Sequence, residues 1–147
     1  MENIYQDKKI EDLKVGEYSV FQKTVSDSDV MMFCGETGDL GPLYQDVCYA
    51  GNSSFGTSVV PPMLLASMTG AAVYRLLKPN AYPIKREFET MKSVQVGDTV
   101  IARAEIMELI KELQQVVLLL EVYDSNHDLV MTGKSVEQLI GRKGGDK

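Results

Sequence analysis

Residues 61–77 read PPMLLASMTGAAVYRLL, and this stretch decides how the rest of the chain has to fold. Proline is favoured at the first positions of a helix, so Pro61-Pro62 predicts a helix start, and Lys78-Pro79 predicts its end. The residues between them are apolar or small on nearly every side. A helix of this kind is typically buried, so the rest of the chain is expected to enclose it.

Strand-like segments follow the predicted helix in close succession. Turn-forming residues separate them at Val96-Gly97-Asp98 and again at 124–128. The predicted strands are Ile84–Val94, Thr99–Leu109, Gln115–Tyr123 and Leu129–Ile140. The run Val116–Leu120 is apolar on both faces, as in a central strand. One buried helix and a meander of long antiparallel strands predict an α+β domain in which a curved sheet wraps the helix. Because such a sheet leaves a free edge, a dimer is expected.

The N-terminal part adds a strand and a capped helix. Tyr18–Val25 alternates as a strand, and Ser26 with Asp29 forms a capping-box pattern for a helix that ends at Gly35 or Gly38. No linker interrupts the sequence, so we predict one domain over residues 1–147 with its core at about 10–140. The tail 141–147 has no apolar anchor and is expected to be disordered.

Composition narrows the class of partner. The net charge of −6 argues against nucleic-acid binding and against binding to an anionic membrane. The apolar region from Val47 to Tyr74 is broken at Gly51–Ser54 and at the two prolines, so it is too short for a membrane span of about 20 residues. Two cysteines and no apolar leader predict a cytoplasmic protein with reduced thiols. With His127 as the one histidine and no ligand-spaced cluster, we expect no metal and no other cofactor.

Four segments resemble a known family, in the same order along the chain. Asp12–Glu17 looks like the family's opening, and TGDLGPLYQD at 37–46 is similar to its T-G-D-x-N-P-L-H-x-D loop. FGTSVVPPMLLAS at 55–67 resembles its F-G-x-x-I-V-H-G-M-L-x-A-S helix start, and VQVGDTV at 94–100 matches its P-V-x-x-G-D-T segment. From about residue 10 to 140 the chain therefore resembles the MaoC-like hydratase/dehydratases, which have the hot-dog fold.

The resemblance implies an acyl-CoA or acyl-carrier-protein thioester as substrate. In the family, the loop aspartate and a histidine five residues later activate the water that adds to, or leaves from, the Cα–Cβ bond, and an N–H at the start of the buried helix meets the enolate oxygen. Carried over to this sequence, the catalytic positions are Asp39 and Tyr44. The positions implied to contact substrate are Gly38, Phe55, Gly56, Val60, Pro62 and Met63.

Three residues depart from the family pattern. Tyr44 stands at the histidine position, and a phenol with an ordinary pKa of about 10 is protonated at neutral pH. Loss of a general base typically costs roughly 10²–10⁴ in rate. Pro62 stands where the family has its oxyanion glycine and has no N–H, a loss of about 10²–10³. Gly41 replaces an asparagine. The pattern resembles the family's histidine-lacking N-terminal-type halves and heterodimer subunits.

Four functions follow as hypotheses. The first is a catalytically incomplete subunit, working as a heterodimer with a histidine-bearing MaoC-like chain. The second is a self-sufficient homodimeric lyase that uses Asp39 as base and Tyr44 as acid. The third is a non-catalytic acyl-binding protein, in which Asp39 only holds its own loop. The fourth, a thioesterase, would need a carboxylate on the central helix, and residues 59–74 contain none.

Overall fold

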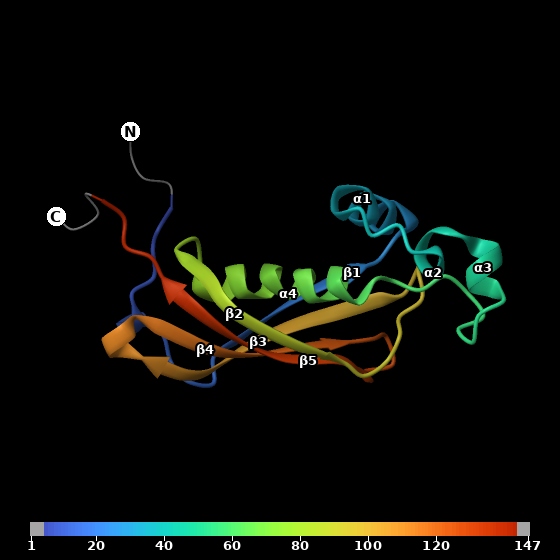
Figure 1. The fold of residues 1–147 in the computed structure, drawn as a ribbon. Helices are drawn as coiled ribbons and strands as arrows, with labels where there is room; N and C mark the ends of the chain where they lie inside the picture. The colour runs from blue at the N-terminus through green and yellow to red at the C-terminus, as the bar shows by residue number, and fades with distance from the viewer. Residues whose placement is uncertain (1–4, 144–147) are drawn as a thin grey trace.

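A five-stranded antiparallel sheet curls along one side of a long helix in the computed structural model, which describes residues 5–143 (Figure 1). The order of strands across the sheet is β1-β3-β4-β5-β2. The strands are β1 (Tyr18–Thr24), β2 (Ala81–Thr90), β3 (Thr99–Ile110), β4 (Gln115–Tyr123) and β5 (Leu129–Leu139). The helices are α1 (Asp27–Thr37), α2 (Pro42–Gln45), α3 (Val47–Gly51) and α4 (Pro62–Leu77), with short 3-10 turns η1 (Ile10–Asp12) and η2 (Lys111–Leu113). The predicted α+β hot-dog architecture is confirmed.

The core lies between the sheet and one face of α4. Leu65, Ala72 and Leu77 on the helix are essentially inaccessible to solvent, as are Ile106 on β3 and Leu118 on β4. On β4, Val116, Leu118 and Leu120 are inaccessible to solvent, whereas Leu119 between them is only partly buried. Burial of this apolar surface is the main source of stability in such a domain.

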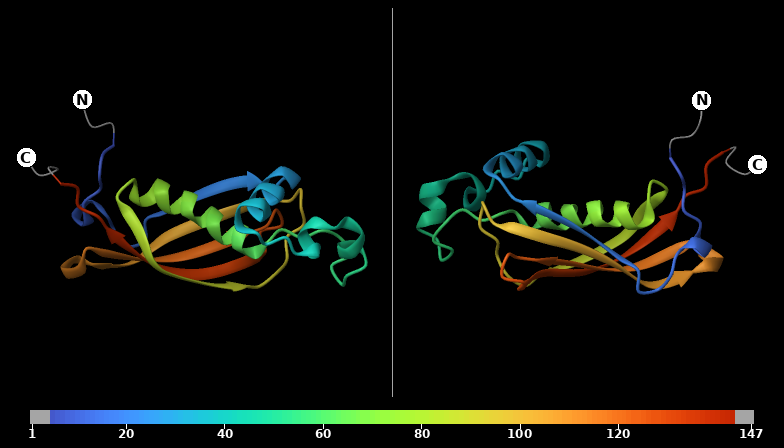
Figure 2. Two further views of the ribbon diagram at one scale, coloured as in Figure 1. Left: turned by 45° about the horizontal axis from the view of Figure 1, so that its top comes forward. Right: turned by 180° about the vertical axis from the view of Figure 1, so that it is seen from behind.

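The opposite face of α4 is not covered. Met63 is 60% exposed and Tyr74 is 55% exposed, so the prediction of a helix enclosed on every side is wrong for this face in the single chain. The physical reason is that one curved sheet can cover only one side of a helix. Figure 2 shows α4 in this open position, with α1, α2 and α3 gathered around its N-terminal end.

Most element boundaries follow the sequence signals, with one instructive exception. Ser26 and Asp29 form the predicted capping box, with N···O distances of 2.9 and 3.1 Å. The strand predicted at 84–94 instead spans 81–90. It begins early because Pro83 lies in the edge strand β2, where a missing N–H is tolerated, beside a bulge between Pro83 and Lys85. It ends early because residues 91–94 leave the sheet and approach the start of α4.

The C-terminal tail is anchored for part of its length. Arg142 Nε lies 2.7 Å from a carboxylate oxygen of Asp7. Residues 144–147 lie outside the described range, so the disorder of the tail stays a prediction. Within residues 5–143 no helix is both long and apolar enough to cross a membrane.

The close approach of β2 to β5 can be tested at Gly133. A β-carbon there would collide with the carbonyl oxygen of Glu87 and come within 2.7 Å of the Phe88 ring. We expect Gly133→Ala to lower the free energy of unfolding by about 1–3 kcal/mol, measured by chemical denaturation. Gly35→Ala in α1, where a β-carbon meets nothing within 4 Å, is the control and should not destabilise the protein. Equal stabilities of the two variants would contradict the packing described here.

Candidate active site

A mainly apolar cavity of about 270 Å³ opens beside the N-terminal end of α4. Four segments form its wall: α2, the loop that leads into α4, the first residues of α4, and residues 90–94 at the end of β2 and beyond it. Side chains of this wall include Leu43, Tyr44, Phe55, Val60, Pro62 and Leu65. Four of the residues implied by the family resemblance, Tyr44, Phe55, Val60 and Pro62, therefore come together around one space.

The side chains of Asp39 and Tyr44 both lie close to Gly41. A β-carbon placed on Gly41 would lie 3.6 Å from Oδ1 of Asp39 and 3.5 Å from the ring of Tyr44. Local structure sets this arrangement. Gly38 ends α1 with a φ of 76°, and the Tyr44 N–H donates to the carbonyl of Gly41 at 3.0 Å. A β-carbon on Gly41 would therefore be in ordinary van der Waals contact with both side chains.

The environment of Tyr44 favours its neutral phenol. The pKa of Tyr44 is raised above its usual value, first by burial of the side chain and then by electrostatic interaction with Asp39 and Cys34. At neutral pH the hydroxyl group therefore keeps its proton. It can donate a hydrogen bond, but it cannot act as the base that a neutral histidine provides.

Asp39 is exposed, and its carboxylate accepts no hydrogen bond from residues 5–143. Its loop is held by other atoms: the Asp39 N–H donates to the Thr37 hydroxyl at 3.2 Å, and the Leu40 N–H donates to the Gly38 carbonyl at 3.0 Å. The hypothesis that Asp39 merely holds its own loop gains no support from these contacts. Its carboxylate is instead free to accept a proton or a hydrogen bond from a ligand.

The first turn of α4 offers few N–H groups. Pro61 and Pro62 have none, and the N–H groups of Leu64 and Leu65 are directed at the carbonyl of Pro61. The N–H of Val60 donates to the carbonyl of Val94 at 2.8 Å. The first N–H of the helix that remains for a ligand is therefore that of Met63, at the positive end of the helix dipole.

Several candidate residues lie outside the cavity. Gly38 caps α1, Gly56 adopts a φ of 69° in a turn, and the Met63 side chain points to solvent. His127 occupies the turn between β4 and β5 with a φ of 62°. In the described part of the chain, no three histidine, cysteine, aspartate or glutamate residues gather closely enough to hold a metal ion.

Lys85, Arg86, Met32 and Met68 lie outside the wall of the 270 Å³ cavity. Lys85 pairs with Glu87 at 3.0 Å, and Arg86 pairs with the buried Glu137 at 2.7 Å. Met68 is buried in the core, whereas Met32 borders a second cavity of about 420 Å³ between α1 and α4. The sequence does not predict residues 90–94 as a wall of the cavity, because its pattern continues the strand predicted at 84–94.

Comparison with known proteins places these features in a family. The chain is 34% identical over 103 residues to 3-hydroxybutyryl-CoA dehydratase of Methylorubrum extorquens, a match that covers 69% of this chain and 66% of that protein. It is 32% identical, also over 103 residues, to the (R)-specific enoyl-CoA hydratase of Rhodospirillum rubrum, covering 69% and 72%. The aligned region thus spans about two thirds of these relatives. A scan against protein-family profiles gave no match.

Solved structures agree in fold. The (R)-hydratase of A. caviae involved in PHA biosynthesis superposes with a TM-score of 0.84 at 26% identity, over 87% of this chain and 98% of that one. A chain of the ChsH1–ChsH2 complex of Mycobacterium tuberculosis gives a TM-score of 0.78 at 12% identity, over 86% and 98%. The second likeness concerns the fold alone.

The electrostatic effect of Asp39 on Tyr44 makes a titration prediction. Because the carboxylate of Asp39 disfavours a second negative charge nearby, Asp39→Asn should lower the pKa of Tyr44. The measurement is an NMR titration with ring-labelled tyrosine, with the Tyr44 signal assigned from Tyr44→Phe. Asp46→Asn, which removes a carboxylate at the N-cap of α3, is the matched control and should leave the pKa of Tyr44 in place. An unchanged pKa in Asp39→Asn would show that the two groups do not interact.

Proposed function

Because the chain belongs to the MaoC-like hydratase/dehydratase family, of the enoyl-CoA hydratase and 3-hydroxyacyl dehydratase type, we propose that it binds an acyl-CoA or acyl-carrier-protein thioester as the catalytically incomplete subunit of such an enzyme. The observation that carries this proposal is the protonated Tyr44 at the position where the family has its histidine base. The acyl chain would lie in the apolar cavity beside the start of α4.

The chemistry of the reaction explains why one subunit of this kind would be incomplete. In hydration, the oxygen of water bonds to Cβ of the enoyl thioester, water gives up one proton, and Cα receives a proton. This step needs a base near the water and a donor for the negative charge that develops on the thioester oxygen. Here Asp39 can accept a proton and Tyr44 can donate a hydrogen bond, but Pro62 offers no N–H and the chain has no imidazole at the site.

A partner chain would supply what is missing. We propose a heterodimer with a histidine-bearing MaoC-like chain that contributes its own aspartate and histidine. The exposed face of α4, with Met63 and Tyr74, gives such a partner an apolar surface to cover. Cys34 and Cys48 are free thiols, as a protein working in the reducing cytoplasm would have.

One observation favours a second candidate function, that of a self-sufficient lyase. Asp39 and Tyr44 flank the same point at Gly41, so a carboxylate base and a phenol acid are available on one loop. A homodimer that uses this pair would be a self-sufficient lyase. The two candidates differ in whether the chain turns over substrate alone.

The deciding experiment is hydration of a short trans-2-enoyl-CoA by the purified chain, followed by loss of enoyl absorbance. We expect no turnover by the chain alone. Turnover should appear when a histidine-bearing MaoC-like chain is added in equal amount, and the two chains should co-elute from a sizing column. Turnover by the chain alone that Asp39→Asn abolishes would instead establish the self-sufficient lyase. Binding of the acyl-CoA without turnover in either setting would leave an acyl-binding protein.

A variant tests the role of position 44 directly. Tyr44→His should give the chain alone a measurable hydratase activity, because it restores an imidazole beside Asp39 and a general base is worth roughly 10²–10⁴ in rate. Tyr49→His in α3, whose side chain is exposed and away from the cavity wall, is the matched control and should stay inactive. Equal activities of the two variants would count against a catalytic position at residue 44.

A further inference from the structure

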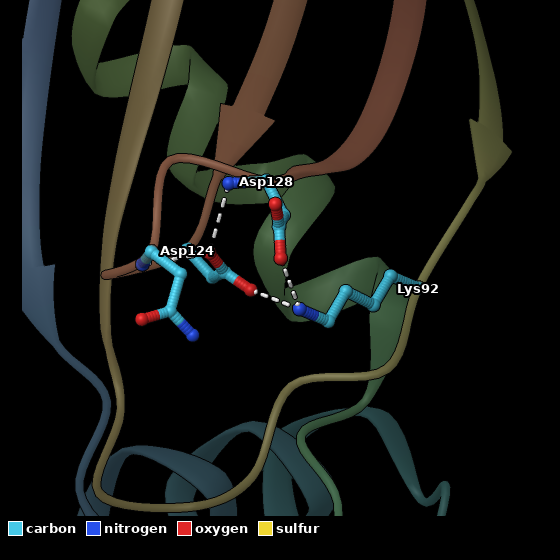
Figure 3. Close-up of polar contacts among 4 residues, drawn as sticks. Lys92, Asp124 and Asp128 are labelled. Carbon is cyan, nitrogen blue, oxygen red and sulfur yellow. Dashed lines mark hydrogen bonds and ion pairs between the residues drawn. The ribbon is translucent and has the colours of Figure 1, made fainter.

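The wall of the cavity is tied to a distant turn by a charged cluster, which we call the Lys92 clamp: Lys92, Asp124 and Asp128. The Lys92 Nζ lies 2.6 Å from Oδ2 of Asp124 and 2.8 Å from Oδ2 of Asp128. Figure 3 shows the lysine reaching from the segment after β2 to the turn between β4 and β5. One ammonium group therefore holds together two parts of the chain that are more than thirty residues apart in sequence.

The turn is built to present these carboxylates. Asp124 is only 4% exposed, and its Oδ1 accepts hydrogen bonds from the N–H groups of Asn126 at 2.9 Å and Asp128 at 3.0 Å. With Oδ1 occupied in this way, Oδ2 points outward to Lys92. The pKa of Lys92 is raised and that of Asp124 is lowered, each chiefly by the hydrogen bond between them, so both groups stay charged at neutral pH.

The clamp acts on the same segment that borders the cavity. The N–H groups of Met91 and Lys92 donate to the carbonyl of Val130 at 2.8 and 3.2 Å, and the carbonyl of Val94 accepts from Val60. Residues 90–94 therefore run between the β4–β5 turn and the residue that precedes Pro61-Pro62. They also form one wall of the cavity beside Tyr44. A shift of Lys92 would move this wall relative to the start of α4.

We propose that the Lys92 clamp is a positioning device that fixes the width of the cavity beside Tyr44 and thereby sets which acyl chains the protein accepts. This inference rests on the proposed function, since it assumes that the cavity holds an acyl chain. Lys92 acts through the backbone of residues 90–94 and is a positioning residue.

Lys92 is poorly suited to bind the phosphate groups of an acyl carrier. The ammonium already contacts two carboxylates, and the three side chains together leave a net negative charge. An anion gains little from such a cluster, because the nearby carboxylates repel it. The cluster therefore fits a structural role at the apolar end of a ligand.

The test combines hydrogen exchange with ligand binding in Lys92→Met, which keeps an unbranched side chain one atom shorter and removes its charge. The amides of Met91 and Lys92 should exchange faster, while those of β3 and β4 stay unchanged. Calorimetric titration with saturated acyl-CoAs of increasing chain length should show a flattened chain-length preference, with the preferred ligand bound about tenfold more weakly. Lys92→Arg should restore both properties.

Lys85→Met is the matched control, because Lys85 also pairs with a carboxylate, Glu87, but does not border the cavity. It should behave as the wild type. If amide hydrogen exchange at positions 91 and 92 is unchanged in Lys92→Met, the proposal that Lys92 holds this segment in place is wrong. Faster exchange with the wild-type chain-length preference would overturn its role in specificity. If the wild type binds no acyl-CoA at all, the proposed function fails and this inference fails with it, whereas the other two outcomes leave the proposed function standing.

Discussion

The packing of α4 against a single curved sheet is the constraint on which the rest of this structure depends. Apolar residues such as Leu65 and Leu77 on one face of the helix bury themselves against β3 and β4, and the sheet has no second layer to cover the other face. Because the middle of the helix is occupied by the core, ligand chemistry is confined to its N-terminal end. There α2, the loop before α4 and residues 90–94 meet around a cavity. The uncovered face is then the natural place for a second chain.

Two residues at the N-terminal end of α4, Tyr44 and Pro62, depart from the family pattern. Tyr44 bears on the transfer of the proton, and Pro62 bears on the negative charge that develops on the thioester oxygen. Tyr44 is half-buried beside a carboxylate, which holds its proton in place and leaves it a donor. Pro62 removes one N–H from the first turn of α4, so that the helix offers its first free N–H one residue later, at Met63. A site of this composition still suits the binding of a thioester: it has an apolar cavity, a hydrogen-bond donor and a positive helix end. Under the proposed function, the partner chain would supply the imidazole that this site does not contain.

Charge plays a second, structural role on the opposite wall of the cavity. Asp124 is nearly buried, and two backbone N–H groups fix its orientation before Lys92 contacts it. A buried carboxylate held in this way loses little entropy when it pairs with Lys92. The ion pair adds to the hydrogen bonds from Met91 and Lys92 to Val130 that anchor the segment after β2. Through Val94 and Val60 the same segment reaches the prolines that begin α4. This wall of the cavity is thereby held by the sheet at one end and by the start of α4 at the other.

The sequence by itself determined the elements whose signals are local. The prolines fixed the start of α4, Ser26 with Asp29 fixed that of α1, and the apolar run at 116–120 identified the central strand. The motif around residues 37–46 predicts Asp39 and Tyr44 as catalytic positions. Only the tertiary structure decided that one face of α4 stays open, that β2 ends at Thr90, and that Lys92 finds its partners in the β4–β5 turn. These features depend on pairing between residues far apart in the chain, and a residue's periodic pattern or turn propensity carries no information about its distant partner.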